Sequence, residues 1–154
     1  MKVTRRIDET TLNLLLHEGL LEKSGVEQAE ARARDLGESP SEAAVNLGLV
    51  SEKDVAKTLC RQLSLPYLDA TRYFIKREVF EILPIRMCET YHLVPLDIIG
   101  DILIVAISEA LPWRALEEIE TTSGMKLRLY VSTLSSVALA TRSLKEQMQS
   151  NKQA

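Results

Sequence analysis

Apolar positions in the first third of the chain follow a helical pattern, and that pattern occurs twice. When residues 11–33 are aligned with residues 40–62, an offset of 29, the Gly-Leu-Leu corner at 19–21 falls on the Gly-Leu-Val corner at 48–50. In both copies, apolar residues three and four apart lead into the corner, which is followed by a polar stretch and a second helical pattern. The repeat therefore predicts two successive helical hairpins.

Polar start signals mark the helices of this repeat. Ser24 with Glu27 is a capping-box pattern, and Ser39 before Pro40 combines a cap residue with a proline at the first helical position. Pro66 ends the helical pattern, because a proline cannot continue a helix. The expected helices cover about 9–18, 24–35, 40–47 and 51–65.

The second half of the chain has a mixed pattern. Residues 93–99 and 102–107 are rich in β-branched side chains, and Gly100-Asp101 between them predicts a two-residue hairpin turn. Beyond the hairpin, helical spacing and alternation predict a helix, a strand and a further helix. The remaining expected elements are two short helices within 77–91 hinged at Pro84, a helix over 112–123, a strand over 126–131 and a last helix from 133 to about 149.

Together these elements predict an α+β fold, in which a pair of helical hairpin repeats precedes a small β-β-α-β-α unit. We expect a helical repeat subdomain over residues 1–64 and a link over 65–76. The small α+β subdomain is expected over 77–149, and residues 150–154 are expected to be a frayed tail.

Composition narrows the function classes. The chain has 154 residues, a net charge of −3 and a pI of about 5.5. A basic helical nucleic-acid binder would suit a doubled helix-turn-helix, but the acidic balance argues against it. No apolar run approaches the roughly 18–20 residues of a membrane span, so we expect no direct membrane insertion. Cys60 and Cys88 are too few for a disulfide framework, and we expect reduced thiols in a cytoplasmic protein.

We find no catalytic constellation in the sequence, and we expect no enzyme, no metal and no cofactor. His17 and His92 have no partners at metal-ligand spacing. The acidic cluster over 117–120 places its carboxylates in different directions on a helix, which favours a solvated face. Cys60 is better explained as part of the core than as a nucleophile, because no histidine lies near it in sequence.

An ordered series of motifs carries a family resemblance. It comprises the Leu-Gly-Leu-Val-Ser-Glu-Lys-Asp-Val run at 47–55, Leu-Pro-Tyr-Leu-Asp at 65–69, the helical stretch 84–91, Leu-Val-Pro-Leu at 93–96 and Thr-Ser-Gly at 122–124. In this order the chain resembles the N-terminal domain of the assembly ATPases of type II secretion and type IV pili, the general secretion pathway protein E N-terminal domain family.

The resemblance implies a non-catalytic adaptor. In this family the domain precedes the motor and docks the motor or a regulator to a protein partner, such as the cytoplasmic part of a membrane-platform protein or the ATPase itself. The chain would then be either a stand-alone adaptor or the front piece of a longer ATPase, and no nucleic acid is implied.

The resemblance also implies an alternative, a cyclic di-GMP sensor. Some members bind this dinucleotide through repeats that each open with Arg-Leu-Gly. The matching positions here are Thr10-Thr11-Leu12 and Ser39-Pro40-Ser41, and Ala33 replaces a glutamine that the second copy keeps. The motif is therefore degenerate. For this alternative alone the candidate ligand-binding residues are Gly19, Leu20, Gly48, Leu49, Val50, Leu59 and Gln62.

Overall fold

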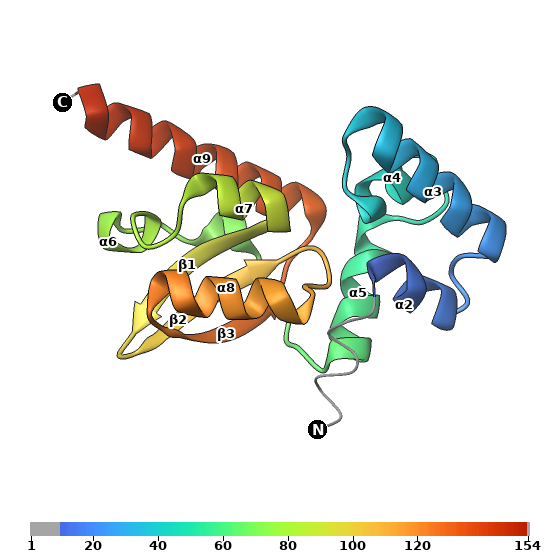
Figure 1. Cartoon of the computed structure of the whole chain (residues 1–154), viewed down its shortest axis with the longest axis horizontal. Coiled ribbons are helices and arrows are strands. Elements are labelled where there is room, and N and C mark those ends of the chain that lie inside the picture. The colour runs from blue at the N-terminus through green and yellow to red at the C-terminus, as the bar shows by residue number, and fades with distance from the viewer. Residues whose placement is uncertain (1–9, 154) are drawn as a thin grey trace.

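The structure, a computed structural model, describes residues 10–153. Four N-terminal helices lie beside a small sheet with its own helices, so the chain forms two neighbouring parts (Figure 1). This is the α+β order predicted from the sequence. The elements are α2 (Thr11–His17), α3 (Lys23–Leu36), α4 (Pro40–Asn46), α5 (Glu52–Leu63), the 3₁₀ turn η1 (Ala70–Arg72), α6 (Arg77–Phe80), α7 (Ile85–Tyr91), β1 (Leu93–Ile99), β2 (Ile102–Ile107), α8 (Trp113–Ser123), β3 (Lys126–Val131) and α9 (Leu134–Gln153).

The two helical hairpins have the same local geometry. Helices α2 and α4 contain seven residues each. The corner glycines Gly19 and Gly48 have φ values of 76° and 74°, a region that favours glycine. In each corner the next N–H bonds back across the helix end at 3.0 Å, Leu20 to the Leu15 carbonyl and Leu49 to the Ala44 carbonyl. Both helices therefore close with the same Schellman pattern.

The start of α4 agrees with the start signal in the sequence, and the start of α3 differs from it. The Ser39 hydroxyl accepts from the Glu42 N–H at 3.2 Å, as expected of a cap. The expected capping box at Ser24 is wrong. Helix α3 begins at Lys23, with Glu22 at the cap position and no side-chain cap bond. The reason is the repeat geometry, since the corner fixes the start of α3 one residue before Ser24, in register with α5.

The sheet has the order β1-β2-β3. β1 and β2 are antiparallel, and Ile99 pairs with Ile102 across the turn in which Gly100 has a φ of 62°. β2 and β3 are parallel and are joined through α8. The predicted hairpin and the β-β-α-β-α order are therefore confirmed, together with the two short helices α6 and α7 on either side of Pro84.

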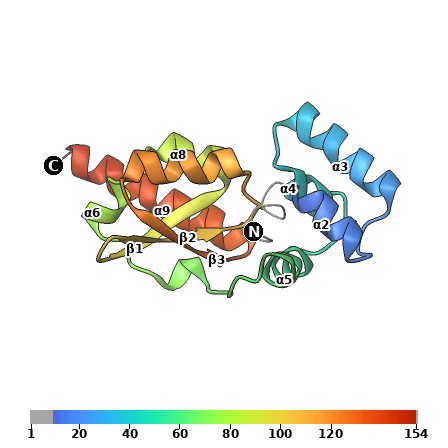
Figure 2. The ribbon, with the colours of Figure 1, turned by 60° about the horizontal axis from the view of Figure 1, so that its bottom comes forward.

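Neighbouring strand residues serve two apolar clusters, because successive side chains point to opposite faces of a sheet. Leu93 and Leu103 belong to a cluster that includes Ile119 of α8 and reaches the helical repeats. Val94 and Ala106 belong to a cluster that includes side chains of α9. Figure 2 shows α8 lying over one face of the sheet. One core thus extends from the sheet into the repeats.

The last helix is longer than expected. α9 continues to Gln153 and does not end near residue 149. Residues 150–153 contain no glycine or proline, so nothing in the sequence stops the helix. Val137, Ala140 and Leu144 face the core from this helix.

Candidate functional site

The openings of the two repeats are capped by their own side chains. The Thr10 hydroxyl accepts from the Asn13 N–H at 3.2 Å, at the start of α2. The Ser39 hydroxyl does the same for α4. These are the positions that match the Arg-Leu-Gly triplets of the dinucleotide-binding relatives described above. Small hydroxyl residues therefore complete each helix where a ligand contact would begin.

A single carboxylate, that of Glu109, connects both openings. Glu109 lies in the loop after β2 and is only 7% exposed. One of its oxygens accepts from the Thr11 hydroxyl, and the other accepts from the Ser41 hydroxyl and from the Ser41 N–H at 3.0 Å. The Ala110 N–H in turn donates to the Thr11 hydroxyl at 2.9 Å. The loop of the α+β part is thus hydrogen-bonded to the first turns of α2 and α4.

Burial of a carboxylate is tolerated when its oxygens are hydrogen-bonded. The Glu109 side chain meets this condition, since three donors from two helix starts surround it. The space that opens the repeats is therefore occupied by an acidic side chain of the chain itself.

The candidate ligand-binding residues expected from the sequence are divided between exposed corners and the apolar core. Gly19 and Leu20 lie on the exposed first corner, and Gly48 lies on the second. Leu49 is half-buried, and a Cβ built at Gly25 would lie 3.5 Å from it. Leu59 is 0% exposed. Val50 is also half-buried within the helical part of the core. Leu49, Val50 and Leu59 thus belong to the packing between the hairpins.

Gln62 meets the first repeat at Glu18, next to the Gly19 corner. The Glu18 carboxylate accepts a hydrogen bond from Arg61 Nε at 2.8 Å and one from the Gln62 side chain. The hydrogen bond from Arg61 has the largest effect on the pKa of Glu18 and lowers it. Desolvation by burial raises this pKa by a smaller amount. The structure therefore brings Gln62 and the first corner together, but through an acidic residue.

Burial disfavours the reactive thiolate form of both cysteines. Cys88 is buried, and desolvation raises the pKa of its thiol to about 12. Burial also raises the pKa of Cys60. In the acidic cluster Glu118 accepts from the Tyr91 hydroxyl at 2.5 Å. Among residues 10–153, no group of three or more His, Cys, Asp or Glu side chains is arranged to hold a metal ion.

The Glu109 contact was missed in the sequence. Glu109 follows a buried strand and precedes Ala-Leu-Pro, which marks the entry to a helix. Its partners Thr11 and Ser41 lie 98 and 68 residues away, and no periodic pattern relates them. The only available signal was an acidic residue between two apolar segments.

Comparison with known proteins defines the class. The MshEN domain model matches residues 63–151, more than half of the chain. The type IV pilus assembly ATPase PilB of Thermus thermophilus is 30% identical over 128 residues, 82% of this chain. The N-terminal domain of XpsE superimposes with a TM-score of 0.63 at 26% identity, covering 86% of this chain and 91% of that one. MshE, solved with cdg, gives 0.62 at 21% identity, covering 88% and 99%.

These matches, with the helical repeats and the β-β-α-β-α unit, define the N-terminal domain of type II secretion and type IV pilus ATPases. The chain belongs to the MshEN domain family. It spans 14% of the PilB sequence and corresponds to the N-terminal domain, not to the catalytic ATPase domain. Among the described residues, no helix has the length and apolar character needed to cross a membrane.

Proposed function

We propose that this chain is a non-catalytic, cytoplasmic interaction domain that docks a motor or regulator of a secretion or pilus machine to its protein partner. The observation that carries the proposal is the Glu109 contact, which ties both repeats to the loop after β2. A domain that holds its two parts in one arrangement can present a fixed surface, and this lowers the entropic cost of binding.

A second contact supports the same conclusion from the opposite direction. Glu52 of α5 accepts from the Ser135 N–H at 3.2 Å and from the Ser135 hydroxyl at 2.6 Å, at the first turn of α9. Each part thus places a carboxylate against a helix start of the other part. Two such contacts at separate points resist both rotation and sliding between the parts.

The cyclic di-GMP sensor is the second candidate, because MshE was solved with cdg. The repeat openings argue against it in this chain. They have no arginine to pair with a phosphate, and the Glu109 carboxylate would repel one. We therefore propose that the repeats of this chain serve as structural support.

Three titrations test the proposal. The purified protein is titrated calorimetrically with the cytoplasmic domain of the platform protein from the same machine, with the cognate motor, and separately with cyclic di-GMP. We expect saturable binding of the platform domain or of the cognate motor in the micromolar range. We expect no heat from the dinucleotide and no ATP hydrolysis above buffer. Failure of both proteins to bind, or micromolar binding of the dinucleotide, would reject the proposal.

A further inference from the structure

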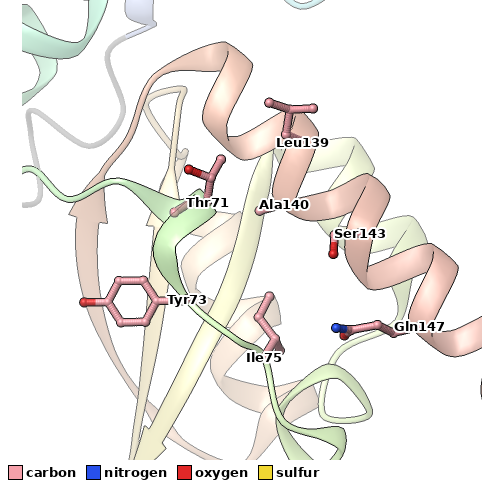
Figure 3. Close-up of a pocket in the computed structure, with 8 residues that line it drawn as sticks. Thr71, Tyr73, Ile75, Leu139, Ala140, Ser143 and Gln147 are labelled. Atoms are coloured by element: carbon pink, nitrogen blue, oxygen red, sulfur yellow. The ribbon is translucent and has the colours of Figure 1, made fainter.

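A groove runs between residues 70–76 and α9, on the face of the molecule that carries the second apolar cluster. Figure 3 shows Ile75 facing Ser143 and Gln147 of α9, while Tyr73 points outward at the edge. One hollow has a volume of about 240 Å³, and an adjoining hollow of about 440 Å³ shares the same three central residues. We call this continuous depression the α9 groove. The residues that line it include Tyr73, Phe74, Ile75, Leu139, Ser143 and Gln147.

The rim of the α9 groove exposes large apolar side chains. Phe74 is 81% exposed, Leu139 is 53% exposed and Tyr73 is 45% exposed. Ile75, the neighbour of Phe74, is buried in the second apolar cluster. The segment is thus anchored by one side chain and presents the next one to solvent. Apolar side chains gathered around a hollow mark an interaction site more often than single exposed residues do.

The same segment is positively charged. Arg72, Lys76 and Arg77 lie between Asp69 and Glu78 with no acidic residue among them. Arg77 pairs with Glu81 at 2.9 Å and Arg72 pairs with Asp69 at 3.7 Å, but the Arg72 side chain is still 85% exposed. A chain with a net charge of −3 therefore has a local basic edge beside its most exposed phenylalanine.

The wall of the groove is partly polar. Ser143 and Gln147 of α9 line both hollows, so the wall carries a hydroxyl and an amide beside the apolar rim.

We propose that the α9 groove binds an amphipathic helix of a partner protein, with an apolar face toward Phe74 and Leu139 and carboxylates toward Arg72 and Lys76. This rests on the proposed function, whose docking surface it names. The groove wall from Leu139 to Ser150 is 12 residues of helix with an axial length of about 16 Å, which accommodates roughly three turns of a second helix.

The charges select a protein over a bilayer. Glu81 and Glu146 lie close to Arg77, since Glu81 pairs with it and Glu146 lines the second hollow together with it. A flat anionic membrane would contact these carboxylates together with the cations. A helix can place its acidic residues beside Arg72 and Lys76 alone, and its apolar residues in the hollow.

A selection experiment tests the chemistry of the occupant without assuming a particular partner. A displayed library of helix-forming peptides is selected against the full chain. We expect enrichment of amphipathic helices with an acidic flank. Binding of the synthesised peptides should weaken at least about tenfold in the double variant F74S/L139S and in R72E/K76E.

Matched variants on the helical repeats serve as controls. L36S removes a comparably exposed leucine of α3, and K53E/K57E reverses two exposed lysines of α5. Both should bind the peptides within about twofold of the unchanged chain. Every changed residue is exposed, so we expect all four variants to fold. Thermal unfolding of each variant checks this.

Three results would reject the proposal that the α9 groove binds a helix. They are the absence of enriched binders, enriched peptides that bind F74S/L139S as well as the unchanged chain, and binding to vesicles of anionic phospholipid in place of peptides. The variants also separate this inference from the proposed function. If the platform domain binds F74S/L139S normally, the groove is rejected and the adaptor role stands. If enriched peptides bind the groove but no machine protein binds the chain, the groove stands and the adaptor role is rejected.

Discussion

The carboxylate of Glu109 accepts a 3.0 Å hydrogen bond from the backbone N–H of Ser41, across 68 residues of sequence. This contact joins the loop after β2 to the first turn of α4. A hydroxyl–carboxylate bond between the same two residues, and another from Thr11, complete the arrangement. The relation between the repeats and the sheet is therefore determined by specific polar contacts in addition to the shared apolar core.

Removal of the Glu109 carboxylate should destabilise the chain. In E109A the Ser41 N–H and the Thr11 hydroxyl lose their buried acceptor, and we expect the free energy of unfolding to fall by about 2 kcal/mol. Urea unfolding followed by circular dichroism measures the change. The control is E117A, which removes an exposed glutamate of α8. A loss in E109A no larger than in E117A would show that the contact contributes nothing to stability.

The corner glycine of the second repeat should not tolerate a side chain. Gly48 has a φ of 74° and open space around its Cβ position, so the cost of G48A comes from the backbone alone, about 1 kcal/mol. The matched control is G25A in α3. There a Cβ would lie 3.3 Å from Leu21 Cδ2, and the helix propensity of alanine offsets the crowding. Equal losses of unfolding free energy in the two variants would contradict this account.

Strands and corners could be predicted from the sequence because their signals are local. Residues 93–99 and 102–107 are rich in β-branched side chains and flank a Gly-Asp turn, and the observed strands have the same bounds. The repeat offset predicted both corners for a similar reason, since Gly19 and Gly48 are each required by one helix end. Such features depend on neighbours within a few residues.

The features that could not be predicted depend on distant partners. Ser24 has a capping-box sequence, yet the corner before it starts α3 one residue earlier. Glu109 has no local feature that indicates Thr11 or Ser41 as partners. The exposure of Phe74 follows from the burial of Ile75 beside α9, which requires knowing how α9 packs. The predicted domain boundaries at residues 64 and 76 stay a prediction.

The two thiols should react at very different rates with a disulfide reagent. Cys60 is half-buried with a raised pKa, and Cys88 is buried with a pKa of about 12. Because the thiolate is the reactive form, we expect slow labelling at Cys60 in the native protein and labelling at Cys88 only after unfolding. Mass spectrometry of tryptic peptides assigns the sites, with C60S as the control. Native labelling of Cys88 in C60S would mean that α7 opens without global unfolding.

The pairing of Glu18 with Arg61 should make the stability of the contact between the two hairpins depend on pH. The hydrogen bond from Arg61 lowers the pKa of Glu18 below its ordinary value of about 4.5. Since the folded pKa is the lower one, the stabilisation is present above pH 4.5 and is lost as the pH falls through the folded pKa. In R61A we expect the pKa of Glu18 to return toward its ordinary value. An NMR titration that follows the side-chain carboxyl carbon of Glu18 measures this pKa. The control is R34A on an exposed position of α3, which should leave the Glu18 titration unchanged. An unaltered titration in R61A would mean that the two side chains do not pair in solution.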